Sequence, residues 1–322
     1  DQGWWPDGLY TAPSDEALLF DVKAMKELGF NMIRKHIKVE PSRWYMHCDR
    51  EGILVWQDLP SPGLPAGHEA FARQNFEEEA VRIIDAFENH PSIVQWVVFN
   101  EGWGQFDTER MTQVVIDKVS PQSLVCCASG WNDAEIGDIK DSHSYPYPSC
   151  PIDQKRACVN GEYGGITLKV PGHIWPGGDF GYTTVETPED FTVMFNDLAD
   201  KIKDHYYYGL NAAVYTQLSD VEIEKNGIYT YDRRILKPYS PTGELKDKIL
   251  ECINMPQSDV KIQPVVSTAK EHKYKWKFIT EDNAPRHWFA KGFDDSLWPK
   301  GTAAFGKSSL WNTQGLISIP WT

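Results

Sequence analysis

The strongest constraint on the fold is a regular alternation of strand and helix signals between residues 11 and 255. The run from Ile93 to Phe99 is almost unbroken in its apolar character, which is typical of a strand buried on both faces of a parallel sheet. The run Thr187-Pro188-Glu189-Asp190 is typical of a helix start, because it offers a capping hydroxyl, a first-turn proline and acidic residues at the positive end of the helix dipole. The alternation predicts a parallel α/β domain.

The expected elements fit a (β/α)8 TIM barrel, an α/β fold, over residues 1–255. Helices are expected near 14–28, 41–51, 69–88, 107–119, 187–202 and 243–252. Strands are expected at 30–34, 53–56, 93–100, 123–128, 139–143, 157–162 and 212–216. Because such a barrel closes with eight strands, we expect the first strand to lie before residue 1 in a longer protein.

Two glutamates follow strand signals and carry the main functional hypothesis. Glu101 comes after the strand that starts near Ile93, and Glu162 follows Ala157-Cys158-Val159 among glycines that permit close approach of a ligand. A pair of carboxyl groups at strand ends is how many glycosidases cut a sugar bond, with one group as acid/base and the other as nucleophile. A single glutamate after a strand would more often be a solvated loop residue.

Composition excludes several other classes of protein. The formal net charge of −14 and the isoelectric point near 5.1 argue against a nucleic-acid surface, and no apolar run approaches the roughly 20 residues of a membrane span. The sequence lacks the metalloprotease, phosphate-loop and serine-hydrolase motifs, so we expect neither metal nor cofactor. The six cysteines lack C-x-x-C spacing, and Cys126, Cys127 and Cys158 are expected to be buried free thiols.

The residues resemble glycoside hydrolase family 2, which holds β-galactosidases, β-glucuronidases and β-mannosidases. The similarity spans residues 1 to about 240 and is carried by LGFNMIRKHIKVEPSRWYMHCDREGILVWQDLP, NHPSIVQWVVFNEGWG, NGEYGG and AAVYTQLSDVEIEKNGIYTYDRR. It implies that Glu101 is the acid/base and Glu162 the nucleophile. It also implies that Asn100 binds the sugar hydroxyl beside the anomeric carbon, and that Arg34 and His36 belong to the substrate site.

Three further residues are expected at the same barrel mouth because they follow strands there. Tyr145 is a candidate hydrogen-bond donor to the nucleophile, His143 a candidate partner of a sugar hydroxyl, and Trp103 a candidate stacking platform for a sugar ring. For each of the three, a packing role is the alternative. Residues 256–322 predict β-strands, and the resemblance implies the start of a carbohydrate-binding β-sandwich that is cut short.

The prediction is therefore a retaining β-glycoside hydrolase, with β-galactosides the first choice of substrate and a glycoside or oligosaccharide the expected partner. One alternative is a non-catalytic carbohydrate-binding fragment of such an enzyme, and another is a scaffold whose glutamates are incidental. A glucuronide would need a cation, which Lys35 or Lys38 could supply. Oligomeric state is left open, as is the compartment, for which a periplasmic or extracellular location is a guess from polysaccharide chemistry.

Overall fold

The structure is a computed structural model, and it describes residues 1–61, 63, 69–256, 275–277, 285, 292–302, 305–306 and 317–318. The chain divides into two compact units, Asp1–Val260 and Lys261–Thr322. The first unit contains all of the predicted site residues, and the second is described only in short pieces. The domain boundary predicted at residue 255 stays a prediction.

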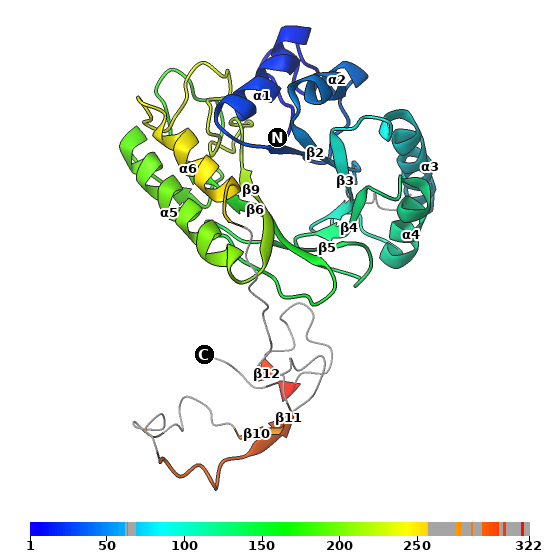
Figure 1. The fold of residues 1–322 in the computed structure, drawn as a ribbon, viewed down its shortest axis with the longest axis vertical. Coiled ribbons are helices and arrows are strands. Elements are labelled where there is room, and N and C mark those ends of the chain that lie inside the picture. Colours follow the sequence, from blue (N-terminus) through cyan, green and yellow to red (C-terminus); the bar gives the residue numbers. More distant parts are fainter. Residues whose placement is uncertain are drawn as a thin grey trace. The chain divides into compact units, whose positions relative to one another are not determined.

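The first unit is a ring of parallel strands with helices outside it (Figure 1). One parallel sheet contains, in spatial order, β1 (Met32–Lys35), β2 (Leu54–Asp58), β3 (Ile93–Asn100) and β4 (Leu124–Ser129). A second parallel sheet contains β5 (Ile139–His143), β6 (Ala157–Gly164) and β9 (Leu210–Thr216). A single antiparallel bridge between Cys126 and Gly137 links β4 to the segment before β5. These strands match the predicted ones within a few residues.

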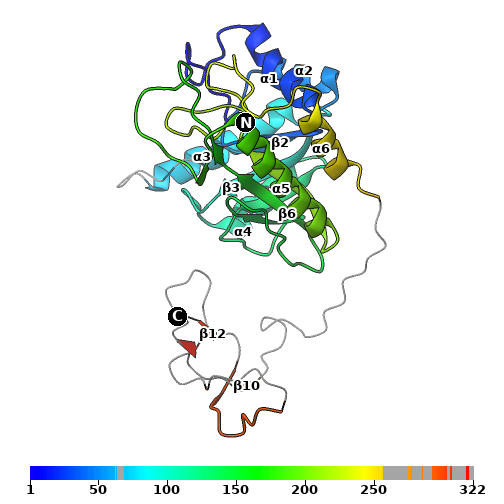
Figure 2. The same ribbon diagram turned by 90° about the vertical axis from the view of Figure 1, so that its left-hand side faces the viewer.

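The helices cover the outside of most of the ring (Figures 1 and 2). They are α1 (Asp15–Glu27), α2 (Ser42–Glu51), α3 (Glu69–Phe87), α4 (Thr108–Lys118), α5 (Pro188–Tyr206) and α6 (Glu244–Ile253). Residues 130–156, all of which are described, contain β5 but no helix. None of the helices in the described parts of the chain has the length and apolarity that crossing a membrane requires.

Local sequence explains where several helices begin and end. The Ser14 hydroxyl caps α1 by accepting a hydrogen bond from the Ala17 amide at 3.2 Å, and Leu18 and Val22 form its buried face. Helix α2 ends at Gly52, whose φ of 68° is in the left-handed region that favours glycine. Thr187 caps α5 as predicted, because its hydroxyl oxygen accepts from the Asp190 amide at 3.1 Å.

The barrel interior has an apolar layer with polar side chains beyond it. The apolar layer takes one buried residue from each of five successive strands: Trp56, Val97, Cys126, Ile139 and Val159. Asp58 and Asp141 lie two residues beyond members of this layer, so their side chains point to the same face of their strands, which is the interior. The carboxyl ends of the strands therefore carry buried polar groups. Cys126, Cys127 and Cys158 are buried free thiols, as predicted.

Asp1 is hydrogen-bonded along β1, beside the place where the missing first strand is predicted. Asp1 donates its amino group to the carbonyl oxygen of Arg34 at 2.8 Å and accepts from the His36 amide at 3.0 Å, which is the hydrogen-bond pattern of a parallel ladder along β1. An eighth strand before residue 1 stays a prediction.

In the second unit, β10 (Lys275–Lys277) pairs antiparallel with β11 (Lys300–Thr302), and β12 (Phe305–Gly306) pairs parallel with β13 (Ile317–Ser318). Much of the predicted β-sandwich lies outside the described residues, and it too stays a prediction.

Candidate active site

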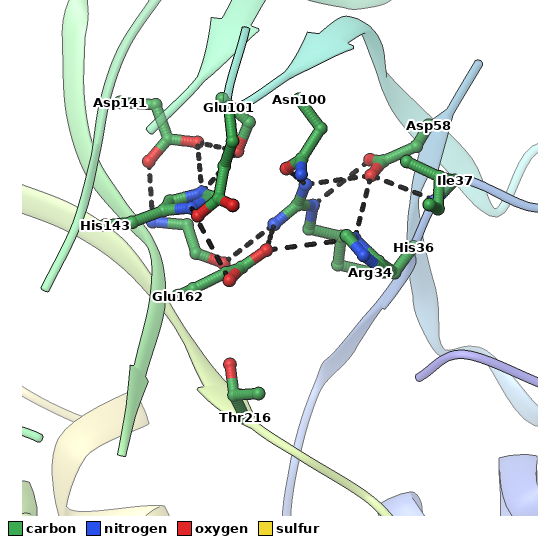
Figure 3. Close-up of polar contacts among 12 residues, drawn as sticks. Arg34, His36, Ile37, Asp58, Asn100, Glu101, Asp141, His143, Glu162 and Thr216 are labelled. Atoms are coloured by element: carbon green, nitrogen blue, oxygen red, sulfur yellow. Dashed lines mark hydrogen bonds and ion pairs between the residues drawn. The ribbon is translucent and has the colours of Figure 1, made fainter. Parts of the chain in front are cut away.

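Glu101 and Glu162 lie close together at the carboxyl ends of β3 and β6 (Figure 3). An oxygen of the Glu101 carboxylate lies within 4.8 Å of one on Glu162. The backbone of Glu101 has a φ of 52°. Its N–H donates a hydrogen bond to the Ser129 carbonyl oxygen at 3.0 Å, and its carbonyl oxygen accepts one from the Trp131 indole at 2.9 Å. The left-handed conformation turns the chain directly after the strand, at the point where the carboxylate is needed.

Arg34 on β1 connects two acidic groups of the site, Asp58 and Glu162 (Figure 3). Its side chain is 2% exposed. Its Nε and Nη2 atoms form a bidentate pair with Asp58 at 3.1 and 2.8 Å, and Nη2 also donates to Asn100 Oδ1 at 2.7 Å. Its Nη1 donates to the Gly161 carbonyl at 3.1 Å and to Glu162 Oε1 at 2.8 Å. All five N–H groups of the guanidinium are thus used within the protein.

The surroundings of Glu162 keep it ionised. The Tyr145 hydroxyl donates to Glu162 Oε2 at 2.6 Å, and Arg34 bonds the other carboxylate oxygen. Burial would raise the pKa of Glu162, but the positive charges of His143, Arg34 and His36 and the Tyr145 hydrogen bond outweigh burial and lower that pKa to about 2. Glu162 is therefore a carboxylate at neutral pH, which is the form that a nucleophile requires.

His143 lies between the two glutamates and is supported from behind. Its Nδ1 is 2.7 Å from Glu101 Oε1 and 3.4 Å from Glu162 Oε2, while its Nε2 is 2.7 Å from the Ser129 hydroxyl. Ser129 donates in turn to Asp141 at 2.5 Å. Burial alone would lower the pKa of His143, but the charge of Glu162, the hydrogen bond to Glu101 and the charge of Asp141 raise it. Both ring nitrogens of His143 are bonded within the protein and 1% of its side chain is exposed, so the binding of a sugar hydroxyl by His143 stays a prediction.

A cavity of about 450 Å³ opens in front of the two glutamates. Of the residues singled out in the sequence, it is lined by Arg34, His36, Asn100, Glu101, Trp103, Tyr145 and Glu162. Among the described residues, His36 Nδ1 has no hydrogen-bond partner, and it lies 3.6 Å from Asp58 and 3.8 Å from Glu162. Trp103 is 63% exposed, as a stacking platform at the edge of a cavity would be, and its role in binding stays a prediction.

Several site residues escaped the sequence analysis. Asp58, Ser129, Asp141 and Thr216 each stand at or near the carboxyl end of a strand, which is the signal that identified Glu101 and Glu162. The Thr216 hydroxyl lies 3.0 Å from the Tyr145 hydroxyl, within hydrogen-bond distance. The same signal, applied to every strand, would have found them. Gln217 also lines the cavity and directly follows β9, so the same signal applies to it. Glu224 lines the cavity as well, but it lies further along the segment after β9 and away from any strand end.

Three side chains of the site are of the kinds that bind metal ions, although the sequence predicts no metal. Glu101, His143 and Glu162 offer one ligand atom each within 4.8 Å of one another, and a divalent cation could take such a set. The 2.7 Å contact between His143 Nδ1 and Glu101, together with the raised pKa of His143, favours a shared proton at this place. That the protein uses neither metal nor cofactor stays a prediction.

Comparison with known proteins identifies the family of the barrel. The sequence model described as "Glycosyl hydrolases family 2, TIM barrel domain" matches residues 12–250, which is most of the chain. The fold expectation of an α/β TIM barrel is thereby confirmed for this part of the chain.

Curated relatives carry several different glycosidase names. The chain is 34% identical to a β-glucuronidase of Bacteroides fragilis over 25% of this chain and 12% of that protein. It is 23% identical to a mannosylglycoprotein endo-β-mannosidase of Lilium longiflorum over 98% of this chain and 32% of that protein. A β-galactosidase of Clostridium acetobutylicum is 22% identical over 73% of this chain and 30% of that protein. The chain thus spans about a third or less of each of these relatives.

Solved structures have the same fold. A β-galacturonidase of family 2 from Eisenbergiella tayi, bound to galacturonate, aligns with a TM-score of 0.60 at 17% identity, covering 77% of this chain and 49% of that one. A Ruminococcus gnavus β-glucuronidase aligns with a TM-score of 0.58 at 15% identity, covering 77% and 49% of the two chains. At such low identity the likeness establishes the fold and leaves the sugar open.

Proposed function

Because the chain belongs to glycoside hydrolase family 2, we propose that it hydrolyses terminal β-glycosides with retention of configuration, using Glu162 as nucleophile and Glu101 as acid/base. The observation that carries this proposal is the pair of carboxylates with oxygens within 4.8 Å of each other at the wall of one cavity. Retaining enzymes hold the two groups about 5 to 5.5 Å apart, while inverting enzymes leave room for a water at about 6.5 to 9.5 Å.

The first step forms a covalent intermediate. A Glu162 oxygen attacks the anomeric carbon while Glu101 gives its proton to the glycosidic oxygen, so that the bond from that carbon to the leaving group breaks. Arg34 and Tyr145 each bond one oxygen of Glu162, and they orient the carboxylate toward the cavity. His143 Nδ1 is 2.7 Å from Glu101 Oε1, so the two groups can share the proton that Glu101 gives up.

The second step returns the enzyme to its starting state. Glu101, now a carboxylate, takes a proton from water as the water oxygen attacks the anomeric carbon, and the ester bond to Glu162 breaks. Asn100 is suited to hold the sugar, because its amide oxygen is taken by Arg34 while its NH₂ group remains for a hydroxyl acceptor on the ligand. β-Galactosides remain the first choice of substrate, because several curated relatives are named β-galactosidase.

The test is hydrolysis of chromogenic β-galactoside, β-glucoside and β-mannoside by the whole chain and by Glu162→Ala. We expect the variant to lose at least about 10³-fold in kcat, because no nucleophile remains. Glu186→Ala is the matched control, since it removes an exposed glutamate outside the residues that line the cavity. A 2-deoxy-2-fluoro glycoside should add the mass of one sugar to Glu162, and proton NMR should show the β-anomer of the product first.

Other outcomes would change the assignment. An α-anomer as first product would replace retention by inversion. Sugar binding without turnover in a folded chain would favour the alternative, a carbohydrate-binding fragment of such an enzyme. Neither binding nor turnover would leave only a scaffold role for the barrel.

A further inference from the structure

The charged groups around the cavity bear on which sugars the proposed glycosidase accepts. The acidic lining residues are Asp1, Glu101, Glu162 and Glu224. Among the lining residues that the structure describes, the cationic side chains are Arg34 and His36. A uronic acid differs from its neutral sugar by a carboxylate in place of a CH₂OH group, so its binding requires a cation or several donors for that carboxylate.

In the part of the chain that the structure describes, each lysine or arginine near the cavity is already bonded to protein groups. All five N–H groups of Arg34 donate hydrogen bonds within the protein, to Asp58, Asn100, Gly161 and Glu162. Lys35, which we considered as a uronate partner, has a side chain that is 0% exposed and is bonded to Asp1 at 2.6 Å and Glu40 at 3.0 Å. Lys38 is likewise bonded to the Gly3 carbonyl at 2.7 Å and to Glu40 at 2.8 Å.

The imidazole of His36 is a further source of positive charge, and it is also limited. His36 faces both Asp58 and Glu162 within 4 Å, so a charge on it is already shared between two carboxylates. The residues at 62 and 64–68, which flank the lining residue Gly63, include no lysine or arginine in the sequence.

The carboxylate of Glu224 favours a ligand hydroxyl over a ligand carboxylate in this cavity. Its Oε2 atom accepts from Gln217 at 3.0 Å and from Gln2 at 3.3 Å, and both glutamines also line the cavity. Gln217 is held in place by its bond to Asn226 at 2.6 Å. The other carboxylate oxygen, Oε1, has no hydrogen bond in the described part of the structure and can accept from a sugar hydroxyl.

We infer that the cavity selects uncharged pyranosides and rejects uronides, with Glu224 as the residue that binds a sugar hydroxyl and excludes a ligand carboxylate. This inference rests on the proposed function and adds the substrate class. Burial raises the pKa of Glu224 above its ordinary value, and the charge of His36 and the hydrogen bond from Gln217 offset only part of this rise. A ligand carboxylate beside Glu224 would either repel it or force it to bind a proton, and both cost free energy. The glucuronidase and galacturonidase names of some relatives are not expected to hold for this chain.

The test compares substrate pairs that differ only at C6. We expect kcat/KM for a chromogenic β-galactoside to exceed that for the β-galacturonide by at least about 100-fold, and likewise for β-glucoside over β-glucuronide, since a buried uncompensated charge costs several kcal/mol. Uronide turnover equal to or faster than turnover of its neutral partner would overturn the inference. Glu162→Ala separates this result from the proposed function, because it should abolish turnover of every substrate that is cut.

Two variants locate the effect at Glu224. Glu224→Gln removes the negative charge, and its amide oxygen accepts a hydroxyl hydrogen bond more weakly than a carboxylate oxygen does. We therefore expect kcat/KM for the neutral substrate to fall at least tenfold, and the ratio of kcat/KM for the neutral substrate to that for the uronide to decrease. Glu222→Gln removes one negative charge two residues away at an exposed position and should change neither value. An unchanged ratio in Glu224→Gln would contradict the assignment to Glu224.

A binding measurement keeps the inference testable even if the chain cuts nothing. Titration calorimetry with galactose, glucose and their uronates on the whole chain should detect the neutral sugars at least tenfold tighter than the uronates. Preferential binding of either uronate, or binding of no neutral sugar at all, would overturn the inference independently of catalysis.

Discussion

Arg34 stabilises a group of carboxylates that could not be buried without it. A buried charge is costly unless it is paired and hydrogen-bonded, and the guanidinium supplies a planar set of donors to Asp58 and Glu162. Burial acts to lower the pKa of Arg34, but the charges of these two carboxylates raise it, so the cation is retained at all ordinary pH values. Removing Arg34 would leave uncompensated buried charge, which makes it a poor choice for testing catalysis.

Tyr145 is a better residue for testing catalysis, because substitution by phenylalanine removes its hydroxyl and keeps its ring. We expect Tyr145→Phe to keep the stacking on Tyr182, whose ring centroid is 3.7 Å away, while removing the hydroxyl that donates to Glu162 and contacts the Thr216 hydroxyl. The less well oriented nucleophile should lower kcat by about 10- to 100-fold, with little change in the affinity for a competitive inhibitor. Steady-state kinetics with inhibitor titration would measure both.

The matched control for this variant is Tyr147→Phe, since Tyr147 is 46% exposed and lies outside the residues that line the cavity. It should leave kcat unchanged. An equal loss of kcat in both variants, or an unchanged kcat in Tyr145→Phe, would show that the hydrogen bond to Glu162 does not contribute to turnover.

In this barrel the capping residues lie at helix starts, whereas the candidate catalytic residues lie at strand ends. The caps at Ser14 and Thr187 lie at helix starts on the outside of the ring and satisfy backbone amides that the helix leaves free. The catalytic candidates lie at strand ends, where parallel strands bring side chains from different parts of the chain to one edge. Substitutions at caps should therefore change stability without changing the site.

Thr187→Ala tests this separation. We expect it to reduce the free energy of unfolding by about 1 kcal/mol, because the Asp190 amide loses its capping acceptor, while kcat stays the same. Val193→Ala is the control on the same helix: Val193 is 71% exposed, and alanine is the better helix former, so the change should be neutral or slightly stabilising. Urea denaturation followed by circular dichroism would measure both. A loss of activity in Thr187→Ala at full folding would contradict the separation.

The buried carboxylates should make the whole barrel sensitive to acid. Asp58 and Glu162 have folded pKa values below their ordinary ones, mainly because the nearby positive charges of Arg34 and the histidines outweigh burial. Their contribution to stability is therefore present above about pH 4.5 and is lost as the pH falls toward 2. For Glu162, the shift from 4.5 to about 2 corresponds to a contribution on the order of 3 kcal/mol.

Asp220 acts in the opposite direction at higher pH. Burial raises its pKa to about 6 despite the bond from Lys237, so its contribution grows as the pH falls from 6 to about 4. We therefore expect the net loss of stability to be concentrated below about pH 4. Urea unfolding at a series of pH values would measure it, and Glu162→Gln should flatten the acid part of the curve. An equally steep acid loss in that variant would locate its cause elsewhere.

Sequence patterns were sufficient for features that depend on neighbouring residues. The strand and helix order, the caps at Ser14 and Thr187, and the position of Glu101 after an apolar run all depend on local preferences, which act over a few residues. The resemblance to family 2 added the roles of the two glutamates. The family comparison confirms both the family and the barrel for residues 12–250.

Only the tertiary structure decided which distant side chains meet. Arg34 contacts Asp58, Asn100 and Glu162, which come from three other strands, and His143 bridges Glu101 and Ser129. A sequence shows that each of these residues stands near a strand end, but strand order and side-chain packing determine which of them face one another. The same holds for Lys35: its sequence context allowed a sugar-binding cation, and its burial against Asp1 and Glu40 makes it structural, because a buried charge must be paired within the protein.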